Sequence, residues 1–287
     1  MLRFLSIVVT LLTLTLSLAA DCSAAQNCDD IKQGIKKQRN LLKKKVLLDQ
    51  GLQNCSEDAE IYYLYAYTAE RLRKYDQAMS YYLKATELDQ DYAKAFFGLG
   101  DIYMVLGNAG AAIRAFEKGL QFVPENRRAK ASLDLARIKH KSESGEAITS
   151  AEFIRVMQES KKEETTSGAL DGPILRLQIR FHIDSAQLTE KAEKQLSTVG
   201  RALESSALEG QTFEISGHTD STGQPEWNLE LSRKRAEEVK AHLSENYSIK
   251  PDSLSIAFFG DTRPAAPNTT TENRALNRRV EFKKLNQ

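Results

Sequence analysis

The sequence predicts the fold class α + α/β, an all-α region of stacked helix pairs followed by an α/β domain. Residues 59–92 and 93–126 are each 34 long and align without gaps, a period typical of arrays of helix pairs. Farther along, residues 211–216 alternate apolar and polar side chains as a half-buried strand does, and helical spacing follows from Pro225. Residues 141–171, low in hydrophobicity and mixed in charge, separate the two regions.

The two 34-residue units carry aromatic residues, alanine and glycine at helix-packing positions. These are Tyr62, Leu64, Ala66, Tyr75, Ala78, Tyr82 and Ala85 in the first unit, and Phe96, Gly98, Gly100, Tyr103, Gly107, Ala112, Phe116 and Pro124 in the second. The pattern resembles the tetratricopeptide repeat (TPR). A degenerate unit over about 27–58 and a capping helix at 129–139 would complete a TPR solenoid of three stacked pairs over residues 26–140. In the first unit Ala66 replaces the usual glycine, and in the second Gly119 replaces a helix-packing alanine.

The resemblance implies that the repeat region recruits a protein or peptide, with an architectural spacer as the alternative. The first unit is rich in tyrosine, with more aromatic rings than packing alone demands, and tyrosine is enriched at interfaces. Its tyrosines include Tyr62, Tyr63, Tyr65, Tyr67, Tyr81 and Tyr82. We expect those that remain exposed to form the partner surface.

Residues 141–171 are expected to form a flexible linker interrupted by one short amphipathic helix. That helix carries Phe153, Ile154, Val156 and Met157, and it could dock on either domain.

The α/β domain brings an acidic loop residue and an arginine near each other. Residues 211–216 read as a strand that enters a turn at Gly217, and a proline at 225 suits the first turn of a helix. Apolar residues then recur at helical spacing; they are Leu229, Ala236, Val239 and Leu243. Asp220 therefore lies on a strand-to-helix loop, and Arg235 borders the buried stripe of the helix, from where it can reach toward the loop.

Several ordered motifs surround this pair. They are RFHIDSAQLTEKA (180–192, expected as a strand and a helix start), GHTD (217–220), LSRKRAEEV (231–239), LSIAFFG (254–260, expected as a strand) and NRALNRRVEF (273–282). Together they resemble the OmpA-like peptidoglycan-binding domain over about 174–285. The resemblance implies a β-α-β-α-β-β sandwich of helices on a sheet, assigned here to residues 172–287. It also implies that the ligand is the meso-diaminopimelate of the peptidoglycan stem peptide, with Asp220 binding the ammonium and Arg235 the carboxylate.

The chemistry of the two side chains agrees with that role, since a guanidinium can meet a carboxylate bidentately and an aspartate accepts from an ammonium. The alternative is that Asp220 only orders its turn and that Arg235 is a solvated helix charge. Asp184, Ser185 and Asn228 are further possible ligand contacts by the same resemblance, although all three residue types also cap helices or shape turns.

Arg278 and Arg279 precede an expected edge or closing strand. They are interpreted as fixing that strand to a neighbouring carboxylate, or as contacting the glycan loosely.

The resemblance implies non-covalent peptidoglycan binding. The alternative is an envelope scaffold or assembly protein in which this domain serves protein contacts. No enzyme is expected: His218 and Asp220 lie two residues apart at a strand end, and no serine stands in a GxSxG motif. The scattered histidines predict no metal site, and no cofactor is expected. A flagellar stator, which shares the resemblance, would need a membrane span that the sequence lacks.

The first residues predict export by a cleaved signal peptide at 1–25. An arginine precedes an apolar run from Leu5 to Leu18, with cleavage after Ala19, Ala20 or Ala25. A lipidated Cys22 is the alternative, although Asp21 stands where a small residue is usual. We therefore expect the protein in the periplasm or at the outer membrane.

An oxidising compartment favours a disulfide between Cys28 and Cys55, the alternative being two thiols. In the extended repeat register, Cys28 falls near the start of one helix and Cys55 just past the end of its partner, so a bridge would hold the exposed N-terminal edge together.

The charge balance excludes a nucleic-acid partner, because 40 basic residues meet 39 acidic ones. The basic run KKQRNLLKKK (36–45) is interpreted as a solvated helix face, with anionic lipid or wall polymer as the alternative.

Overall fold

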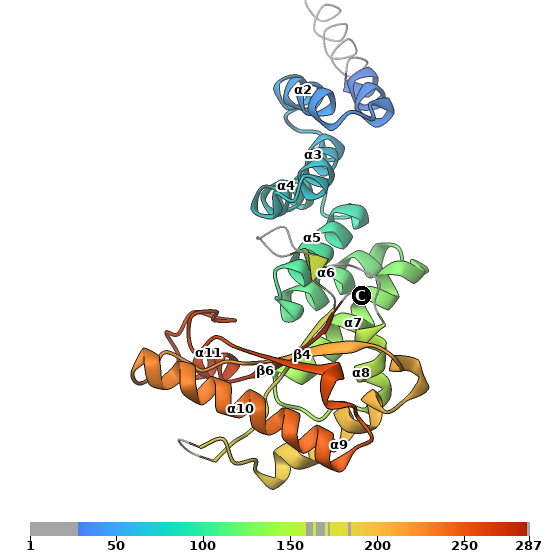
Figure 1. Cartoon of the computed structure of the whole chain (residues 1–287). Helices are drawn as coiled ribbons and strands as arrows, with labels where there is room; N and C mark the ends of the chain where they lie inside the picture. The colour runs from blue at the N-terminus through green and yellow to red at the C-terminus, as the bar shows by residue number, and fades with distance from the viewer. Residues whose placement is uncertain (1–27, 159–162, 165–169, 172, 183–184, 286–287) are drawn as a thin grey trace, which may run out of the picture. The chain divides into compact units, whose positions relative to one another are not determined.

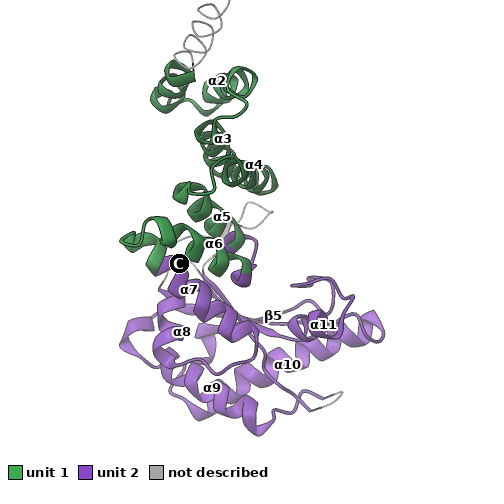
Figure 2. Cartoon of the chain, turned by 180° about the vertical axis from the view of Figure 1, so that it is seen from behind, with its two compact units in different colours: residues 1–103, 111–130 green, residues 104–110, 131–287 purple. Residues whose placement is uncertain are grey.

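The computed structural model of this chain describes residues 28–158, 163–164, 170–171, 173–182 and 185–285. The expected signal peptide, Cys22 and the expected ligand contact Asp184 lie outside these residues. The chain forms two compact units, coloured separately in Figure 2: residues 1–103 with 111–130, and residues 104–110 with 131–287. The first is helical and the second combines helices with a mixed sheet, which confirms the predicted fold class.

Helices joined by short turns make up the first unit. They are a helical stretch over residues 28–37, α2 (Leu41–Asn54), α3 (Ala59–Arg71), α4 (Tyr75–Leu88), α5 (Ala93–Val105) and α6 (Ala109–Phe122) (Figure 1). Each expected 34-residue repeat is one helix pair, α3 with α4 and α5 with α6. Asp58 caps α3, because its side chain accepts hydrogen bonds from the backbone N–H groups of Glu60 and Ile61.

Glycines on α5 and α6 let aromatic rings pack against the helix backbone. A Cβ added at Gly98 would lie 2.3 Å from Cζ of Tyr82, and one at Gly119 would lie 2.5 Å from Cε1 of Phe97. Gly119, which departs from the repeat pattern, makes room for the Phe97 ring. An alanine at this position would not fit beside that ring.

The tyrosines of the first repeat divide between core and surface. Tyr65 and Tyr82 are buried, and Tyr82 donates a hydrogen bond to Glu70 at 2.7 Å. Tyr62, Tyr63 and Tyr81 are half-buried, whereas Tyr67 is 42% exposed. Five of these six rings are therefore buried or half-buried in the packing of the repeat, and Tyr67 is the most exposed of the six.

Cys28 and Cys55 are joined by a disulfide that closes the first helix pair of the chain. The two residues are 27 apart in sequence. Cys55 is buried against the Ile35 and Leu48 cluster, so the bridge continues the apolar core of this helix pair.

We predict that changing both cysteines to serine lowers the free energy of unfolding of the repeat region by about 2 to 4 kcal/mol, because the bridge restricts the unfolded chain. Urea unfolding followed by circular dichroism measures this. A reducing agent should lower the wild-type midpoint and leave the variant unchanged, and equal midpoints under all conditions would contradict the prediction.

The second unit contains most of α7, then one further helix and a short strand pair before the sheet. These elements are α7 (Arg127–Glu143, of which residues 127–130 belong to the first unit), α8 (Ser150–Met157), β1 (Glu163–Glu164) and β2 (Leu170–Asp171). The remainder are β3 (Ile174–Leu177), α9 (Glu190–Leu203), the 3₁₀ turn η1 (Ser206–Leu208), β4 (Thr212–Gly217), α10 (Pro225–Asn246), the 3₁₀ turn η2 (Pro251–Ser253), β5 (Leu254–Phe258), α11 (Thr271–Asn277) and β6 (Val280–Leu285).

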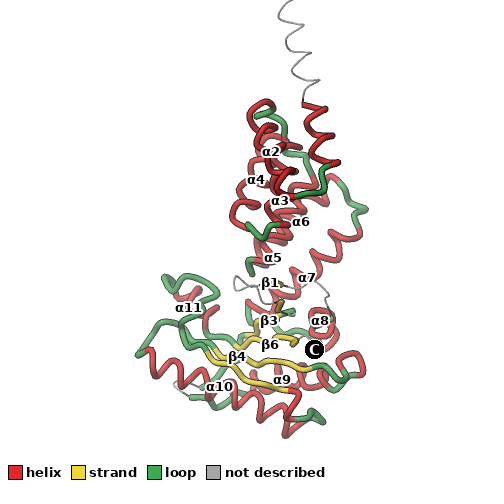
Figure 3. Tube along the Cα trace, turned by 45° about the horizontal axis from the view of Figure 1, so that its top comes forward, coloured by secondary structure: helices red, strands yellow, loops and turns green. Residues whose placement is uncertain are grey.

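Four strands form the sheet in the order β3-β6-β4-β5, and Figure 3 shows β3, β6 and β4 side by side. β4 and β5 are parallel, joined by the α10 crossover, whereas β6 runs antiparallel to both β3 and β4. The strand after Arg279, expected as an edge or closing strand, is an interior strand of the sheet. Its interior place follows from pairing with β3, which lies more than a hundred residues earlier in the sequence.

The predicted strand at the start of RFHIDSAQLTEKA is wrong. β3 is Ile174–Leu177, and Phe181 makes only an isolated bridge with Leu188. The chain turns back on itself there, because His182 N–H donates to the carbonyl of Gln187 at 2.9 Å. A hairpin-like loop therefore stands where a strand was expected.

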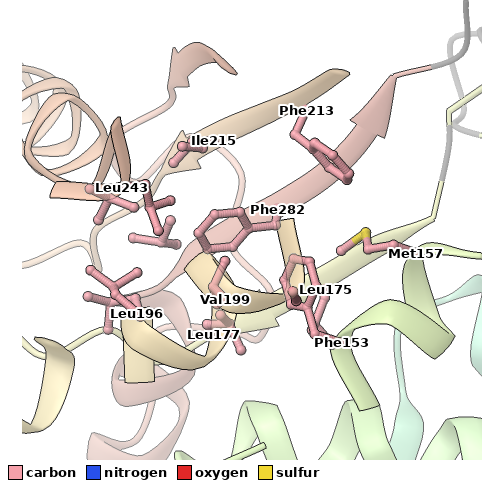
Figure 4. Packing of buried hydrophobic residues seen from close by; sticks show 14 of the residues in the cluster. Phe153, Met157, Leu175, Leu177, Leu196, Val199, Phe213, Ile215, Leu243 and Phe282 are labelled. Atoms are coloured by element: carbon pink, nitrogen blue, oxygen red, sulfur yellow. The ribbon is translucent and has the colours of Figure 1, made fainter. Parts of the chain in front are cut away.

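The core of the second unit lies between the sheet and its helices (Figure 4). The Phe153 ring of α8 meets the Phe282 ring of β6 edge to face, with ring centroids 5.8 Å apart. The short helix expected within 141–171 is α8, and it packs into this core through Phe153, Val156 and Met157. Thr149 and Glu152 form a capping box at its start, which explains where it begins.

In the part of the chain that the structure describes, no helix is both long and apolar enough to span a bilayer.

Candidate functional site

The loop between β4 and α10 is held close to the helix by a glycine. A Cβ added at Gly217 would lie 2.1 Å from the backbone oxygen of Ser232, so the strand end touches the α10 backbone. The Ser232 hydroxyl accepts a hydrogen bond from the N–H of Gly260 at 3.0 Å. These contacts fix where the loop carrying Asp220 leaves the sheet.

Asp220 lies at the base of this loop and is only 6% exposed. One carboxylate oxygen accepts from the Thr222 N–H at 2.8 Å, and the other accepts from Nη1 of Arg278. Burial opposes ionisation of this carboxyl, but the hydrogen bonds from Arg278 and Thr222 outweigh it and hold the pKa of Asp220 below its usual range. Asp220 is therefore an anion at neutral pH.

Asn228 braces the loop from the first turns of α10. Its side-chain amide donates to the carbonyl oxygens of Asp220 and Thr222 at 3.2 and 3.0 Å. The residue is 3% exposed. The hydrogen bonds of Asn228 therefore give it the turn-shaping role that was the alternative to a ligand contact.

Arg235 lies two turns farther along α10 and is half-buried. Its Nε donates to the backbone oxygen of Ser185 at 3.2 Å, and its guanidinium carbon lies 4.9 Å from the centre of the Phe181 ring. The Ser185 hydroxyl accepts from the Gln187 N–H at 2.9 Å, so that side chain shapes its own turn. These two contacts of Arg235 are therefore with the segment that carries Phe181 and Ser185.

A cavity of about 450 Å³ joins these residues. It is lined by Phe181, His182, Thr219, Asp220, Thr222, Gly223, Trp227, Asn228, Leu231, Arg235 and Arg278. The volume lies within the range of small-ligand sites. Charges of both signs face it, so it can hold a group that carries an ammonium and a carboxylate. Asp220, Arg235 and Asn228 all line this cavity. Ser185 is not among its lining residues, and its backbone oxygen accepts the hydrogen bond from Arg235.

Arg278 and Trp227 are cavity residues that the sequence reasoning did not assign to the ligand site. Arg278 does bind a carboxylate, as interpreted, but its partner is Asp220, so it adds a second cation to the cavity. The buried Asn277 side chain positions this stretch by bonding the backbone of Ala265 and Ala266. The motif NRALNRRVEF was the available signal, but no spacing rule pairs its arginine with a loop 58 residues earlier.

Arg279 points elsewhere. Its guanidinium pairs with Glu281 at 2.7 Å, and Arg176 approaches the same carboxylate at 3.1 Å. Burial opposes ionisation of Glu281, but Arg176 and Arg279 lower its pKa to about 2. This buried ion cluster fixes β6 to β3 and is separate from the cavity.

His218 is a core residue of the strand end. It is 2% exposed and its ring lies 5.3 Å from that of Phe259. Burial lowers its pKa to about 4, so the ring is neutral at neutral pH. His218 does not line the cavity beside Asp220. Among the described residues, no group of three or more histidine, cysteine or acidic side chains could hold a metal ion.

Comparisons with known proteins match the two halves of the chain separately. A sequence model of the OmpA family matches residues 180–278, and models described as TPR repeat and tetratricopeptide repeat match 71–107 and 93–126. The peptidoglycan-associated lipoprotein of Pseudomonas aeruginosa is 34% identical over 125 residues, which cover 41% of this chain and 72% of that protein. Outer membrane porin F of the same organism is 32% identical over 107 residues, 37% of this chain and 30% of the porin. The chain thus spans less than a third of the porin's length.

Among solved structures, the cell wall anchor of the T6SS from Pseudomonas aeruginosa is 25% identical. Its alignment has a TM-score of 0.36 and covers 42% of this chain and 85% of that one.

Proposed function

The chain belongs to the OmpA family, and from that premise we propose that its C-terminal domain, residues 172–287, binds peptidoglycan without chemical change. The recognised group is the meso-diaminopimelate of the stem peptide. The observation that carries this proposal is the cavity that brings Asp220 together with Arg235, although 15 residues separate them. A relative named peptidoglycan-associated lipoprotein, aligned over most of its length, supports peptidoglycan as the binding target.

In the proposed complex, the free α-amino-acid end of diaminopimelate enters the cavity. Its ammonium donates to the Asp220 carboxylate, and its carboxylate accepts from the Arg235 guanidinium. Each charged hydrogen bond contributes about 1.5 to 3 kcal/mol net, so the pair together with loop backbone contacts reaches the roughly 8 kcal/mol of micromolar-class binding. Arg278 holds one oxygen of Asp220 and the Thr222 N–H the other, so the ammonium takes a remaining lone pair of either oxygen or displaces Arg278.

The repeat region, residues 26–140, recruits a protein partner in this proposal, and residues 141–171 connect the two functions. The family models for tetratricopeptide repeats support this role, as does the 42% exposure of Tyr67 on α3. Removal of a signal peptide at 1–25 would leave the exported protein in the periplasm or associated with the outer membrane. The wall is accessible from both places. The whole chain then acts as a non-enzymatic adaptor of the cell envelope.

Co-sedimentation with insoluble peptidoglycan sacculi tests the proposal. We predict that wild-type mature protein sediments with sacculi and that Asp220→Ala and Arg235→Ala each weaken binding at least about tenfold, because each removes one charged contact. Free meso-diaminopimelate should compete the wild type off the sacculi.

Two matched variants control for charge and folding. Arg233→Ala removes an arginine two positions earlier on α10, where it pairs with Glu230 and Glu237 outside the cavity. Asp252→Ala removes an exposed aspartate near η2. Both controls should sediment like wild type, with circular dichroism confirming that all four variants are folded. A wild type that stays in the supernatant, or Asp220→Ala and Arg235→Ala proteins that sediment normally, would refute the proposed site.

A further inference from the structure

The chain has one tryptophan, and it stands at the cavity. Trp227 is 51% exposed and lines the same cavity as Asp220 and Arg235. Tryptophan carries the largest apolar surface of any side chain, so leaving half of it in water forgoes stabilisation that burial would provide. Packing of the domain therefore does not account for its position.

The other aromatic wall of the cavity is already covered. The Arg235 guanidinium lies over the Phe181 ring at 4.9 Å. No ring-stacking or cation contact in the described part of the chain involves Trp227. Of the Phe181 and Trp227 rings at the cavity, that of Trp227 is the one whose face is open to a ligand.

The backbone of Trp227 is held rigidly against the proposed ligand site. Pro225 starts α10, and the N–H of Asn228 donates to the Gln224 carbonyl at 2.9 Å. The Asn228 side chain then ties this turn to the carbonyl oxygens of Asp220 and Thr222. The backbone that carries the indole is thus fixed one residue from Asn228, which limits the backbone entropy lost on binding.

We propose that Trp227 forms a sugar-stacking subsite that holds a pyranose ring of the glycan strand while the cavity holds the stem peptide. This inference rests on the proposed function, because a stem peptide in the wall is covalently attached to an amino sugar. A pyranose presents one face of C–H groups that packs on an aromatic ring, and its hydroxyls remain in water at the cavity rim. An open indole on a fixed backbone beside a peptide-binding cavity has the chemistry for that face.

The test uses two soluble probes on the mature protein. One is the sugar-free tripeptide L-Ala-γ-D-Glu-meso-diaminopimelate, and the other is the same tripeptide on a GlcNAc-MurNAc disaccharide. Because Trp227 is the only tryptophan, intrinsic fluorescence reports its environment alone. We expect the disaccharide probe to bind more tightly, and to shift the tryptophan emission more than the tripeptide does.

Trp227→Ala should weaken binding of the disaccharide probe by roughly three- to tenfold more than it weakens binding of the tripeptide, measured by calorimetry. Trp227→Phe keeps a smaller ring and should retain most of the sugar's contribution. Leu229→Ala, an exposed apolar residue two positions farther along α10 that does not line the cavity, should bind both probes like wild type.

Separate outcomes distinguish this inference from the function on which it rests. If the tripeptide binds wild type but Trp227→Ala weakens both probes equally, or neither, the sugar subsite is wrong and the peptide site stands. Equal affinity of wild type for the two probes also overturns the subsite. If the tripeptide does not bind wild type at all, the proposed function fails and the subsite fails with it.

Discussion

Replacing Gly217 with alanine is expected to destabilise the C-terminal domain by at least about 3 kcal/mol, which is a large part of the stability of an ordinary domain. The added Cβ would lie 2.1 Å from the carbonyl oxygen of Ser232. That oxygen belongs to the α10 backbone, so no side-chain rotation can relieve the clash. β4 cannot move away either, because it is hydrogen-bonded to β5 on one side and β6 on the other.

Chemical denaturation of the Gly217→Ala protein measures this effect, with the fluorescence of Trp227 in the same domain as the probe. Gly34→Ala is the matched control, since its helix position leaves the nearest atom, Cδ1 of Leu47, at 3.9 Å. Alanine there should stabilise the helix by about 0.5 to 1 kcal/mol. An unfolding midpoint for Gly217→Ala equal to that of wild type would show that the strand and helix are not in contact as described.

Replacing Arg279 with methionine is expected to cost about 3 to 5 kcal/mol, because it leaves the buried Glu281 carboxylate with less compensation. Arg279 is 6% exposed and contacts Glu281 through two nitrogens, Nε and Nη2. In the variant Arg176 still lies near that carboxylate, with its Nε 3.1 Å from Oε1 of Glu281. This remaining contact limits the loss of stability.

The pH dependence of this effect has a definite sign. The pKa of Glu281 is lowered to about 2 in the folded protein, below the value of about 4.3 for an unfolded glutamate. The ion cluster therefore contributes fully above about pH 4.3, and its contribution is lost as the pH falls toward 2. The stability deficit of Arg279→Met should accordingly be largest near neutral pH and shrink in acid.

Urea unfolding of wild type and Arg279→Met at neutral and acidic pH measures both parts of this prediction. The double variant Arg279→Met with Glu281→Met should recover part of the lost stability, since it also removes the uncompensated charge. Arg233→Met serves as the control, because Arg233 pairs on the exposed side of α10. A deficit that is the same at every pH would exclude the ion cluster as its cause.

Local periodicity was sufficient to predict the elements around the candidate site. The alternation at 211–216 corresponds to β4, Pro225 begins α10, and the motif at 254–260 contains β5. The same helical spacing placed Arg235 beside the buried face of α10. The prediction for Leu229 was wrong, since it is 42% exposed while Leu231 and Ser232 are buried in that part of the helix. At this end of α10 the inward side chains meet backbone groups, since Asn228 donates to the carbonyl of Asp220 and Ser232 accepts from the N–H of Gly260.

The amino-acid sequence by itself determined the two kinds of structure, the repeat period and the side chains able to bind a zwitterion, because all of these depend on residues close together in the chain. Only the tertiary structure decided that β6 is an interior strand, that α8 packs on Phe282, and that Arg278 meets Asp220. It also left Trp227 open at the cavity. These features join segments distant in sequence, and their pairing depends on how strands and side chains from the whole domain pack together, which no short-range pattern encodes.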